Sequence, residues 1–309
     1  MLTLITGASG SGKSLFAEQY IKQKWKSDQE LFYVATMKPY GEETKQKIER
    51  HREQREGKGF LTIECYEGLD TISIQKKESA ILLECLSNLL ANAMYDEMGN
   101  RVDRGIVERI GRELEQLEAK CSRLVVVTNE VFSAVPSKWE DSVIYIRNLG
   151  HLNQKLAKKA EEVYEVIGGI PMKRKGGEAE RESEQFEEGI DKSERRILVL
   201  GGAFQGKTRW ARKQWEQREI VYLNEVIKTI WKDEPCEKEE IWIKIEKLWK
   251  TGENKIFLVD EIGYGLVSID KKEREYRELV GRMTCQLAEQ ADEVYRVVAG
   301  IPQKIKERI

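Results

Sequence analysis

The sequence has few of the features that mark secreted proteins or proteins that wrap nucleic acid. Its 309 residues include five cysteines, five prolines and two histidines, and the formal net charge is -2. The cysteines are widely spread without a Cys-x-x-Cys pair, which favours free thiols in a reducing compartment over a disulfide framework or a zinc site. The lack of an excess of Lys and Arg argues against a protein that wraps nucleic acid through counterion release, so any basic site must be local.

Long hydrophobic runs are also missing. No apolar stretch approaches the roughly 20 residues that a membrane-spanning helix needs. The amino-terminal segment MLTLITGASGSGKS passes from a short apolar stretch into a glycine-rich loop, without the basic and cleavage regions of a secretory signal. Hydrophobic residues make up 40% of the chain and charged residues 34%, which is typical of globular proteins. We therefore expect a cytoplasmic globular protein with no membrane span.

Two pairs of similar segments indicate an internal duplication. ITGASGSGKS at 5–14 matches VLGGAFQGKT at 199–208, an offset of 194 positions. LAKKAEEVYEVIGGIP at 156–171 matches LAEQADEVYRVVAGIP at 287–302, an offset of 131 positions. Because the offsets differ by 63, the second copy is expected to lack 63 positions that follow the glycine-rich loop in the first copy.

Each copy is predicted to be an α/β domain whose mostly parallel sheet has helices on both faces. Short apolar runs alternate with segments of helical spacing, which is typical of such sheets. A charged linker at 174–195 is expected to separate a near-full domain at 1–173 from a shortened repeat at 196–309. The predicted strands are 2–5, 31–35, 80–83, 124–127 and 163–167 in the first copy and 197–200, 220–223, 256–259 and 294–298 in the second, with helices at 14–24 and 106–117.

The first copy carries the phosphate-loop pattern G-x-x-x-x-G-K-[ST] between an apolar strand and a helical segment. Its glycines let successive backbone N–H groups face one concavity, and the following helix N-terminus favours an anion. We expect Lys13 to reach the β and γ phosphates of a nucleotide and Ser14 to hold Mg²⁺. A glycine-containing turn without a ligand is the alternative. The predicted nucleotide-binding residues of this loop are Gly7, Ala8, Ser9, Gly10, Ser11, Gly12, Lys13 and Ser14.

The second copy completes the same pattern with Gly201, Gly206, Lys207 and Thr208. These residues are further candidates for nucleotide binding. A vestigial loop that binds nothing is the alternative interpretation.

Several further segments of the first copy carry a family resemblance. They are LFYVAT at 31–36, KIERHREQR at 47–55, ILLECLSNLL at 81–90, VVVTNEV at 125–131 and GHLNQKLAKKAEEVYEVIGGIP at 150–171. Together with the loop, they resemble the adenosylcobinamide kinase / adenosylcobinamide-phosphate guanylyltransferase family, over nearly all of residues 1–173. The resemblance implies a RecA-like P-loop fold and a kinase step on adenosylcobinamide, with GTP or ATP as phosphate donor. It also implies a second step in which a histidine carries GMP from GTP to the new phosphate.

The same resemblance implies a corrinoid substrate. It further implies a homo-oligomer, or a pairing of the two copies within one chain.

His51 is the candidate nucleophile for GMP transfer, because neutral imidazole attacks phosphorus near pH 7 and its phosphoramidate is a good donor. The family pattern resembles His-His-Arg-x-x-Arg-Pro, whereas residues 50–56 read RHREQRE. If the nucleophile corresponds to the first histidine, the step is lost; if it corresponds to the second, His51 keeps it. A solvated histidine on a charged helix is the alternative, and His151 is interpreted as structural or incidental.

Two acidic residues follow apolar strands of the first copy. Glu84 stands where P-loop proteins place a carboxylate that supports Mg²⁺. Lys13 and Glu84 therefore join His51 as candidate catalytic residues, and Ser14 and Glu84 are the candidate Mg²⁺ ligands. Glu130 matches a family signature near the nucleotide. A strand that ends in a surface glutamate is the alternative for Glu84.

The missing stretch is expected to include any counterpart of His51 and of Glu84, with Asp260 as a replacement carboxylate in the second copy. Three functions stay open at this point. The leading prediction is that the chain carries out both family reactions. The alternatives are a P-loop small-molecule kinase without guanylyl transfer and a non-catalytic nucleotide-binding paralogue. The altered histidine pattern favours the second, and the survival of Lys13, Ser14 and Glu84 together opposes the third.

Overall fold

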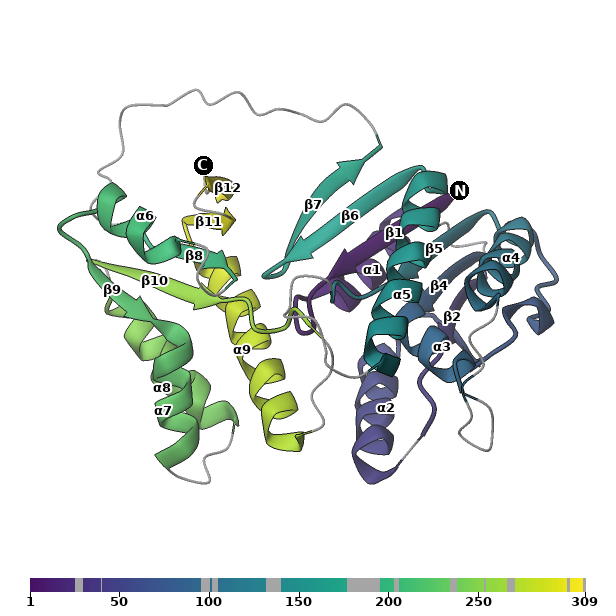
Figure 1. Cartoon of the computed structure of the whole chain (residues 1–309), viewed down its shortest axis with the longest axis horizontal. Coiled ribbons are helices and arrows are strands. Elements are labelled where there is room, and N and C mark those ends of the chain that lie inside the picture. Colours follow the sequence, from purple (N-terminus) through teal and green to yellow (C-terminus); the bar gives the residue numbers. More distant parts are fainter. Residues whose placement is uncertain are drawn as a thin grey trace. The chain divides into compact units, whose positions relative to one another are not determined.

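The computed structural model consists of two α/β units, drawn in Figure 1. The first holds residues 1–7, 13–165 and 173–179, and the second holds residues 8–12, 166–172 and 180–309. Among the described residues, no helix is long and apolar enough to cross a membrane. The structure describes all residues except 26–29, 40, 96–100, 102–104, 132–139, 177–194, 203–205, 234–237, 253, 266–269, 299–300 and 308–309, together with the side chains of Glu43, Lys47, His51, Gln54, Lys232, Asp233, Lys238 and Ile301.

The first sheet has seven strands in the order β3-β2-β4-β5-β1-β6-β7. Strands β1, β5, β4, β2 and β3 pair in parallel along this order. The central strands are continuous apolar runs, as expected where both faces of a parallel sheet are covered. The strands are β1 Leu2–Gly7, β2 Leu31–Ala35, β3 Leu61–Glu64, β4 Ala80–Glu84, β5 Arg123–Val127, β6 Glu162–Ile167 and β7 Ile170–Lys175.

Helices cover both faces of this sheet, as predicted. Alternate strand residues such as Leu4, Leu83 and Val126 pack in one cluster with α3, α4 and α5. Helix α1 contacts β4 and β5 and buries Ala17 and Ile21 on the opposite face. The helices are α1 Lys13–Lys24, α2 Gly41–Arg55, the short 3₁₀ helix η1 Leu69–Thr71, α3 Leu86–Ala93, α4 Ile106–Ala119 and α5 Glu140–Lys159.

The second sheet has five strands in the order β12-β11-β8-β10-β9, drawn in green to yellow in Figure 1. All pairs are parallel except β11 with β12, which is antiparallel. The core cluster on one face includes residues of α7, α8 and α9, and the cluster on the other includes Ala211 of α6. The elements are β8 Ile197–Gly201, α6 Lys207–Gln214, β9 Glu219–Tyr222, α7 Leu223–Asp233, α8 Lys238–Lys250, β10 Lys255–Asp260, α9 Lys271–Gln290, β11 Glu293–Val298 and β12 Ile301–Glu307.

The two sheets have the same internal register. Ile5 pairs with Val127 in the first sheet, and Val199, 194 positions after Ile5, pairs with Leu258, 131 positions after Val127. The sheet order then makes β9 the counterpart of β4, because each lies beside the strand that follows two helices. The duplication inferred from the sequence is therefore visible in the pairing of individual residues.

The second copy lacks the counterparts of β2, α2 and β3, since α6 ends at Gln214 and β9 begins at Glu219. A counterpart of His51 is absent, as expected. The expectation for Glu84 was wrong in part, because its strand is retained. Leu83 pairs with Val126 and Val221 pairs with Phe257, so Tyr222 stands at the position of Glu84.

All nine predicted strands are confirmed to within two residues at their ends, and both predicted helices are present. Strands β3, β7 and β12 were not predicted. Within the expected linker at 174–195, residues 174–175 belong to β7 and residues 177–194 lie outside the described residues.

Candidate active site

The carboxyl edge of the seven-stranded sheet gathers the predicted residues of the first copy. Strands β1, β2, β3, β4 and β5 run parallel, so their carboxyl ends meet at one edge of the sheet. Ligands of open α/β sheets bind outside such an edge. Lys13 follows β1 through the loop, Glu84 ends β4, and Glu130 lies three residues beyond β5.

The phosphate loop has the backbone that its sequence predicts. Gly10 and Gly12 adopt φ angles of 74° and 85°, a left-handed conformation that glycine tolerates without a Cβ penalty. Lys13 begins α1 and is 9% exposed. The Ser11 hydroxyl oxygen is buried and has no hydrogen-bond partner within the described part of the chain. A buried polar atom of this kind is satisfied when a ligand with hydrogen-bonding groups fills the loop.

The segment after β5 is tied to the loop strand. The backbone N–H of Glu130 donates to the Gly7 carbonyl at 2.9 Å, which sets Glu130 beside the start of the loop. The Thr128 hydroxyl donates to the side-chain oxygen of Asn153 in α5 at 2.8 Å. The Asn129 amide donates to the Ser87 hydroxyl at 2.6 Å. The Thr-Asn-Glu signature therefore bridges three elements at the carboxyl edge.

A strained turn follows Glu84. Cys85 has a φ of 71°. Among the described residues, all others with a positive φ are glycines. Such a conformation costs about 1–3 kcal/mol and is found most often at functional sites. The Thr36 hydroxyl donates to the Glu84 carbonyl at 2.7 Å and to the Cys85 carbonyl at 2.9 Å, which stabilises the turn. The end of β4, and with it Glu84, is thereby fixed against β2.

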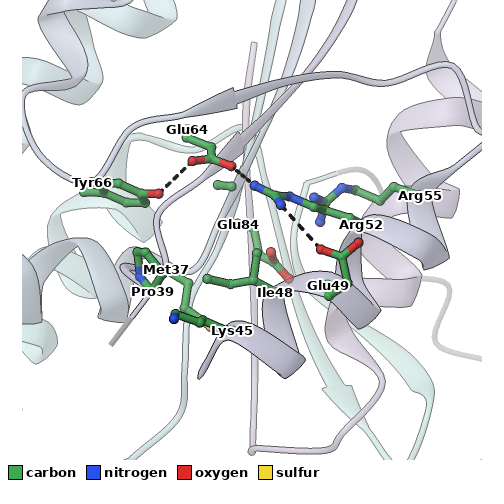
Figure 2. Close-up of a pocket in the computed structure, with 11 residues that line it drawn as sticks. Met37, Pro39, Lys45, Ile48, Glu49, Arg52, Arg55, Glu64, Tyr66 and Glu84 are labelled. Carbon is green, nitrogen blue, oxygen red and sulfur yellow. Dashed lines mark hydrogen bonds and ion pairs between the residues drawn. The ribbon is translucent and has the colours of Figure 1, made fainter. Parts of the chain in front are cut away.

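Helix α2 covers a cavity of about 280 Å³ at this edge, shown in Figure 2. Its walls come from the ends of β2, β3 and β4 and from one side of α2. Three cationic and three acidic side chains line it together with apolar ones, so the formal charges of the lining balance. The lining residues are Ala35, Met37, Pro39, Lys45, Ile48, Glu49, Arg52, Arg55, Glu64, Tyr66 and Glu84.

One side of the cavity is an ordered ion-pair network. Arg52 pairs with Glu64 and, at 3.4 Å, with Glu49. The Tyr66 hydroxyl donates to Glu64 at 2.8 Å. Tyr66 and Arg52 together hold the pKa of the Glu64 carboxyl below its usual value. Glu64 is therefore an anion near neutral pH, and its carboxylate is the ion-pair partner of Arg52.

Arg55 is in a different situation. It is 7% exposed, and its guanidinium carbon lies 3.9 Å from the centre of the Tyr33 ring. Within the described residues it forms no ion pair inside 4 Å, and its Nε has no hydrogen-bond partner. A buried charge without a partner is costly, whereas an anion bound in the cavity would compensate it. Arg55 is therefore a candidate group for binding an anion in the cavity.

Glu84 closes the cavity at the end of β4 (Figure 2). Burial raises the pKa of the Tyr33 hydroxyl far above its usual value, and the nearby Glu84 carboxylate adds to the rise.

Mg²⁺ prefers oxygen ligands and is commonly bound through one or two protein oxygens together with substrate phosphates. The Ser14 hydroxyl and the Glu84 carboxylate are donors of this type on one sheet edge. They fit a magnesium ion that arrives with a nucleotide.

The structure places the predicted residues as follows. Lys13, Ser14, Glu84 and Glu130 lie at the carboxyl edge of the first sheet, and His51 lies in α2, with its side chain outside the described residues. His151 is exposed on α5. Gly201 ends β8 of the second sheet, Gly206 directly precedes α6, and Lys207 and Thr208 are the first two residues of α6.

Sequence reasoning did not single out Lys45, Arg52, Arg55, Glu64 or Tyr66. For the two arginines a signal was present, because they occupy the two Arg positions of the pattern His-His-Arg-x-x-Arg-Pro. Lys45, Glu64 and Tyr66 carry no such signal.

Comparison with protein families agrees with the phosphate loop and with the duplication of the α/β unit. The model of a family described as "Cobinamide kinase / cobinamide phosphate guanyltransferase" matches residues 3–174 and 223–305. The second range begins at α7, so the match continues into the shortened copy.

Similar curated proteins include the bifunctional adenosylcobalamin biosynthesis proteins CobU of Escherichia coli and of Salmonella typhimurium. They are 31% and 32% identical over 187 and 186 residues, which is 57% of this chain and 100% of each relative. CobP of Pseudomonas aeruginosa is 31% identical over 180 residues, 57% of this chain and 98% of its own length.

Similar solved structures include an ATPase domain with a TM-score of 0.32 and 12% identity, over 53% of this chain and 68% of that chain. The flagellar accessory protein FlaH of Methanocaldococcus jannaschii has a TM-score of 0.30 and 18% identity over 57% of this chain and 78% of that chain. Both TM-scores are low, so the fold assignment depends on the sheet order, the phosphate loop and the family match.

Proposed function

Because the chain belongs to the cobinamide kinase / cobinamide phosphate guanyltransferase family, we propose that the carboxyl edge of its first sheet carries out both reactions named for that family. The substrate class is a corrinoid of the cobinamide type, with GTP or ATP as phosphate donor and GTP as GMP donor. The observation that supports this most directly is Arg55, a buried cation without an ion-pair partner in the described residues, at the end of the helix α2 that bears His51.

In the kinase step, an alcohol oxygen of the corrinoid attacks the γ-phosphorus and the nucleoside diphosphate leaves. Lys13 and the loop amides bind the β and γ phosphates. Ser14 and Glu84 would hold a Mg²⁺ ion, which would supply positive charge to these phosphates. Such a reaction depends mainly on position and electrostatics. Glu130 is held beside Gly7 and contributes to nucleotide binding.

In the second step, a neutral imidazole nitrogen of His51 attacks the α-phosphorus of GTP and pyrophosphate leaves. An oxygen of the corrinoid phosphate then attacks the same phosphorus and releases His51. Arg55 is a suitable group to stabilise the negative charge of the transferring phosphate, because charge-assisted hydrogen bonds from Arg are strong in a buried site.

The test is incubation with GTP labelled at the α-phosphate, with and without Mg²⁺, followed by denaturation. We expect acid-labile label on the protein that disappears in His51→Ala. His151→Ala is the matched control, since it changes the other histidine of the chain, which is exposed. Label that persists in His51→Ala, or that disappears in His151→Ala, would contradict the assignment.

A kinase without guanylyl transfer is the second candidate. The observation in its favour is the altered pattern around His51, where Arg50 and Glu56 replace the first histidine and the proline. Label from γ-labelled nucleotide on the corrinoid, with none on the protein from α-labelled GTP, would select this candidate.

We further propose a cytoplasmic location, which the lack of a disulfide at Cys65, Cys85, Cys121 and Cys285 supports. The assembly state, a homo-oligomer or a pairing of the copies within one chain, stays a prediction to be measured by light scattering.

A further inference from the structure

The second phosphate loop already has an anion on its lysine. Lys207 begins α6 directly after Gly206, whose φ is 87°, and it is 6% exposed. Its ammonium lies 2.5 Å from the Asp260 carboxylate and donates to the Gly202 carbonyl at 2.6 Å. The group that would contact phosphate oxygens is therefore neutralised by a side chain of its own unit.

Asp260 is held in place for this contact. It ends β10, and its register partner in the parallel strand β8 is Gly201, so both lie at one sheet edge. Asn224 fixes its backbone on both sides: the Asp260 N–H donates to the Asn224 side-chain oxygen at 2.7 Å, and the Asn224 amide donates to the Asp260 carbonyl at 3.1 Å. The Tyr276 hydroxyl donates to the Asn224 carbonyl at 2.8 Å. The ion pair is thus part of a wider hydrogen-bonded network.

The first copy has a neutral residue at the same position. Asn129 lies 131 positions before Asp260, and its amide is engaged with the Ser87 hydroxyl. Ser87 is the second residue of α3, as Asn224 is the second residue of α7. In both copies the segment after this strand is therefore bonded to the start of the next helix, through the Asn129 side chain in the first copy and through the Asp260 backbone in the second, and at this position only the second copy has a carboxylate.

We propose that Asp260 is a built-in competitor for phosphate in the second loop, so that this loop binds nucleoside triphosphates weakly until the Lys207–Asp260 pair is broken. A buried ammonium requires a counter-ion, and Asp260 supplies it in this loop. An entering phosphate must displace this carboxylate from Lys207 and then lie beside a like charge. Both effects weaken binding.

Asp260 also has an alternative interpretation. In the second copy it would bind Mg²⁺, the role that Glu84 is predicted to have in the first copy. The two interpretations predict opposite signs. If Asp260 competes with phosphate, its neutralisation tightens nucleotide binding, and if it supports Mg²⁺, neutralisation weakens it. The short contact with Lys207 favours competition.

The experiment uses the full chain with Lys13→Ala, which removes the lysine of the first loop. Binding of magnesium GTP, and separately of inorganic pyrophosphate, is measured by calorimetry in Lys13→Ala and in Lys13→Ala/Asp260→Asn. We expect affinity at least tenfold higher in the double variant, and loss of that gain when Lys207→Ala is added. Unchanged or weaker binding in the double variant would overturn the proposal.

Asp292→Asn in the Lys13→Ala background is the matched control for the change in net charge. Asp292 is an acidic residue of the same unit, and its partner is Arg196, 3.5 Å away. We expect no gain in affinity there, and an equal gain would overturn the proposal. If Asp260→Asn folds poorly, Asp260→Ser replaces it, and pyrophosphate should raise its melting temperature more than that of the Lys13→Ala parent. No additional rise would likewise contradict competition.

Discussion

The two sheets of this chain have strands in the same register but different carboxyl edges. In the first, α2 and the ends of β2, β3 and β4 enclose a cavity of about 280 Å³ that contains an arginine without an ion-pair partner in the described residues. In the second, β9 follows α6 after four residues, and none of the elements equivalent to β2, α2 and β3 is present. The lysine of its loop is paired with Asp260.

The difference shows that a parallel sheet and its phosphate loop persist when the groups around the loop have changed. The core needs the apolar strands and the helices on both faces, and both copies keep these. The charged side chains at the carboxyl edge of each sheet are under a different constraint, because a buried ion is stable only with a partner of opposite charge. In the first copy Arg55 has no ion-pair partner among the described residues, and in the second copy Asp260 is the partner of Lys207.

The largest expected effect separates the two loop lysines. Lys13→Ala should lower phosphoryl transfer to a cobinamide substrate roughly 100- to 1,000-fold, the usual cost of removing one strong electrostatic contact in a transition state. Lys207→Ala should lower it by less than about threefold. Initial rates at saturating nucleotide measure both, and similar losses in the two variants would remove the distinction between the copies.

Arg55→Met tests the cavity itself. Transfer of GMP should fall about 100-fold, because the transferring phosphate loses its buried cation. The free energy of unfolding should stay the same or rise, because Met fills similar space without a buried, unpaired charge. Calorimetry and labelling with α-labelled GTP measure the two quantities.

Arg52→Met is the matched control for this prediction. The Arg52 side chain is 49% exposed and already paired with two glutamates, so the loss of GMP transfer should be smaller. A clear loss of stability in Arg55→Met together with unchanged transfer would mean that Arg55 is structural.

The sequence predicted the strands of the two sheets better than it predicted the side-chain contacts at their carboxyl edges. The central strands are apolar runs that show their burial directly. Strand β3 has four residues with no fully buried side chain, and β12 reads IPQKIKE, so neither carries that signal. Arg55 and Tyr33, like Lys207 and Asp260, meet through tertiary contacts that no local pattern reports. Strand β9 was predicted, but its equivalence to β4 was missed, because an offset counts absent positions without saying which strand remains.

Glu84 and Tyr222 provide a smaller contrast at equivalent strand ends. Glu84→Gln should raise the Mg²⁺ concentration needed for half-maximal activity by about 10- to 100-fold, the range typical of groups that support a metal site. High Mg²⁺ should restore much of the rate. Tyr222→Phe should leave the Mg²⁺ requirement within about twofold. Mg²⁺ titrations of the kinase rate test both, and an unchanged requirement in Glu84→Gln would exclude Glu84 from the metal site.

The smallest effect concerns Glu64, on β3, an element that the second copy lacks. Tyr66 and Arg52 hold the pKa of the Glu64 carboxyl below its usual value of 4.5 in the folded chain. The resulting stability is present above pH 4.5 and is lost as the pH falls through the lower folded value. Because both partners of the ion pair are more than 40% exposed, the contribution should be below about 0.5 kcal/mol. Melting temperatures of Glu64→Gln and the wild type should therefore differ slightly at pH 7 and converge under acid, and a difference that grows under acid would reverse the assigned sign.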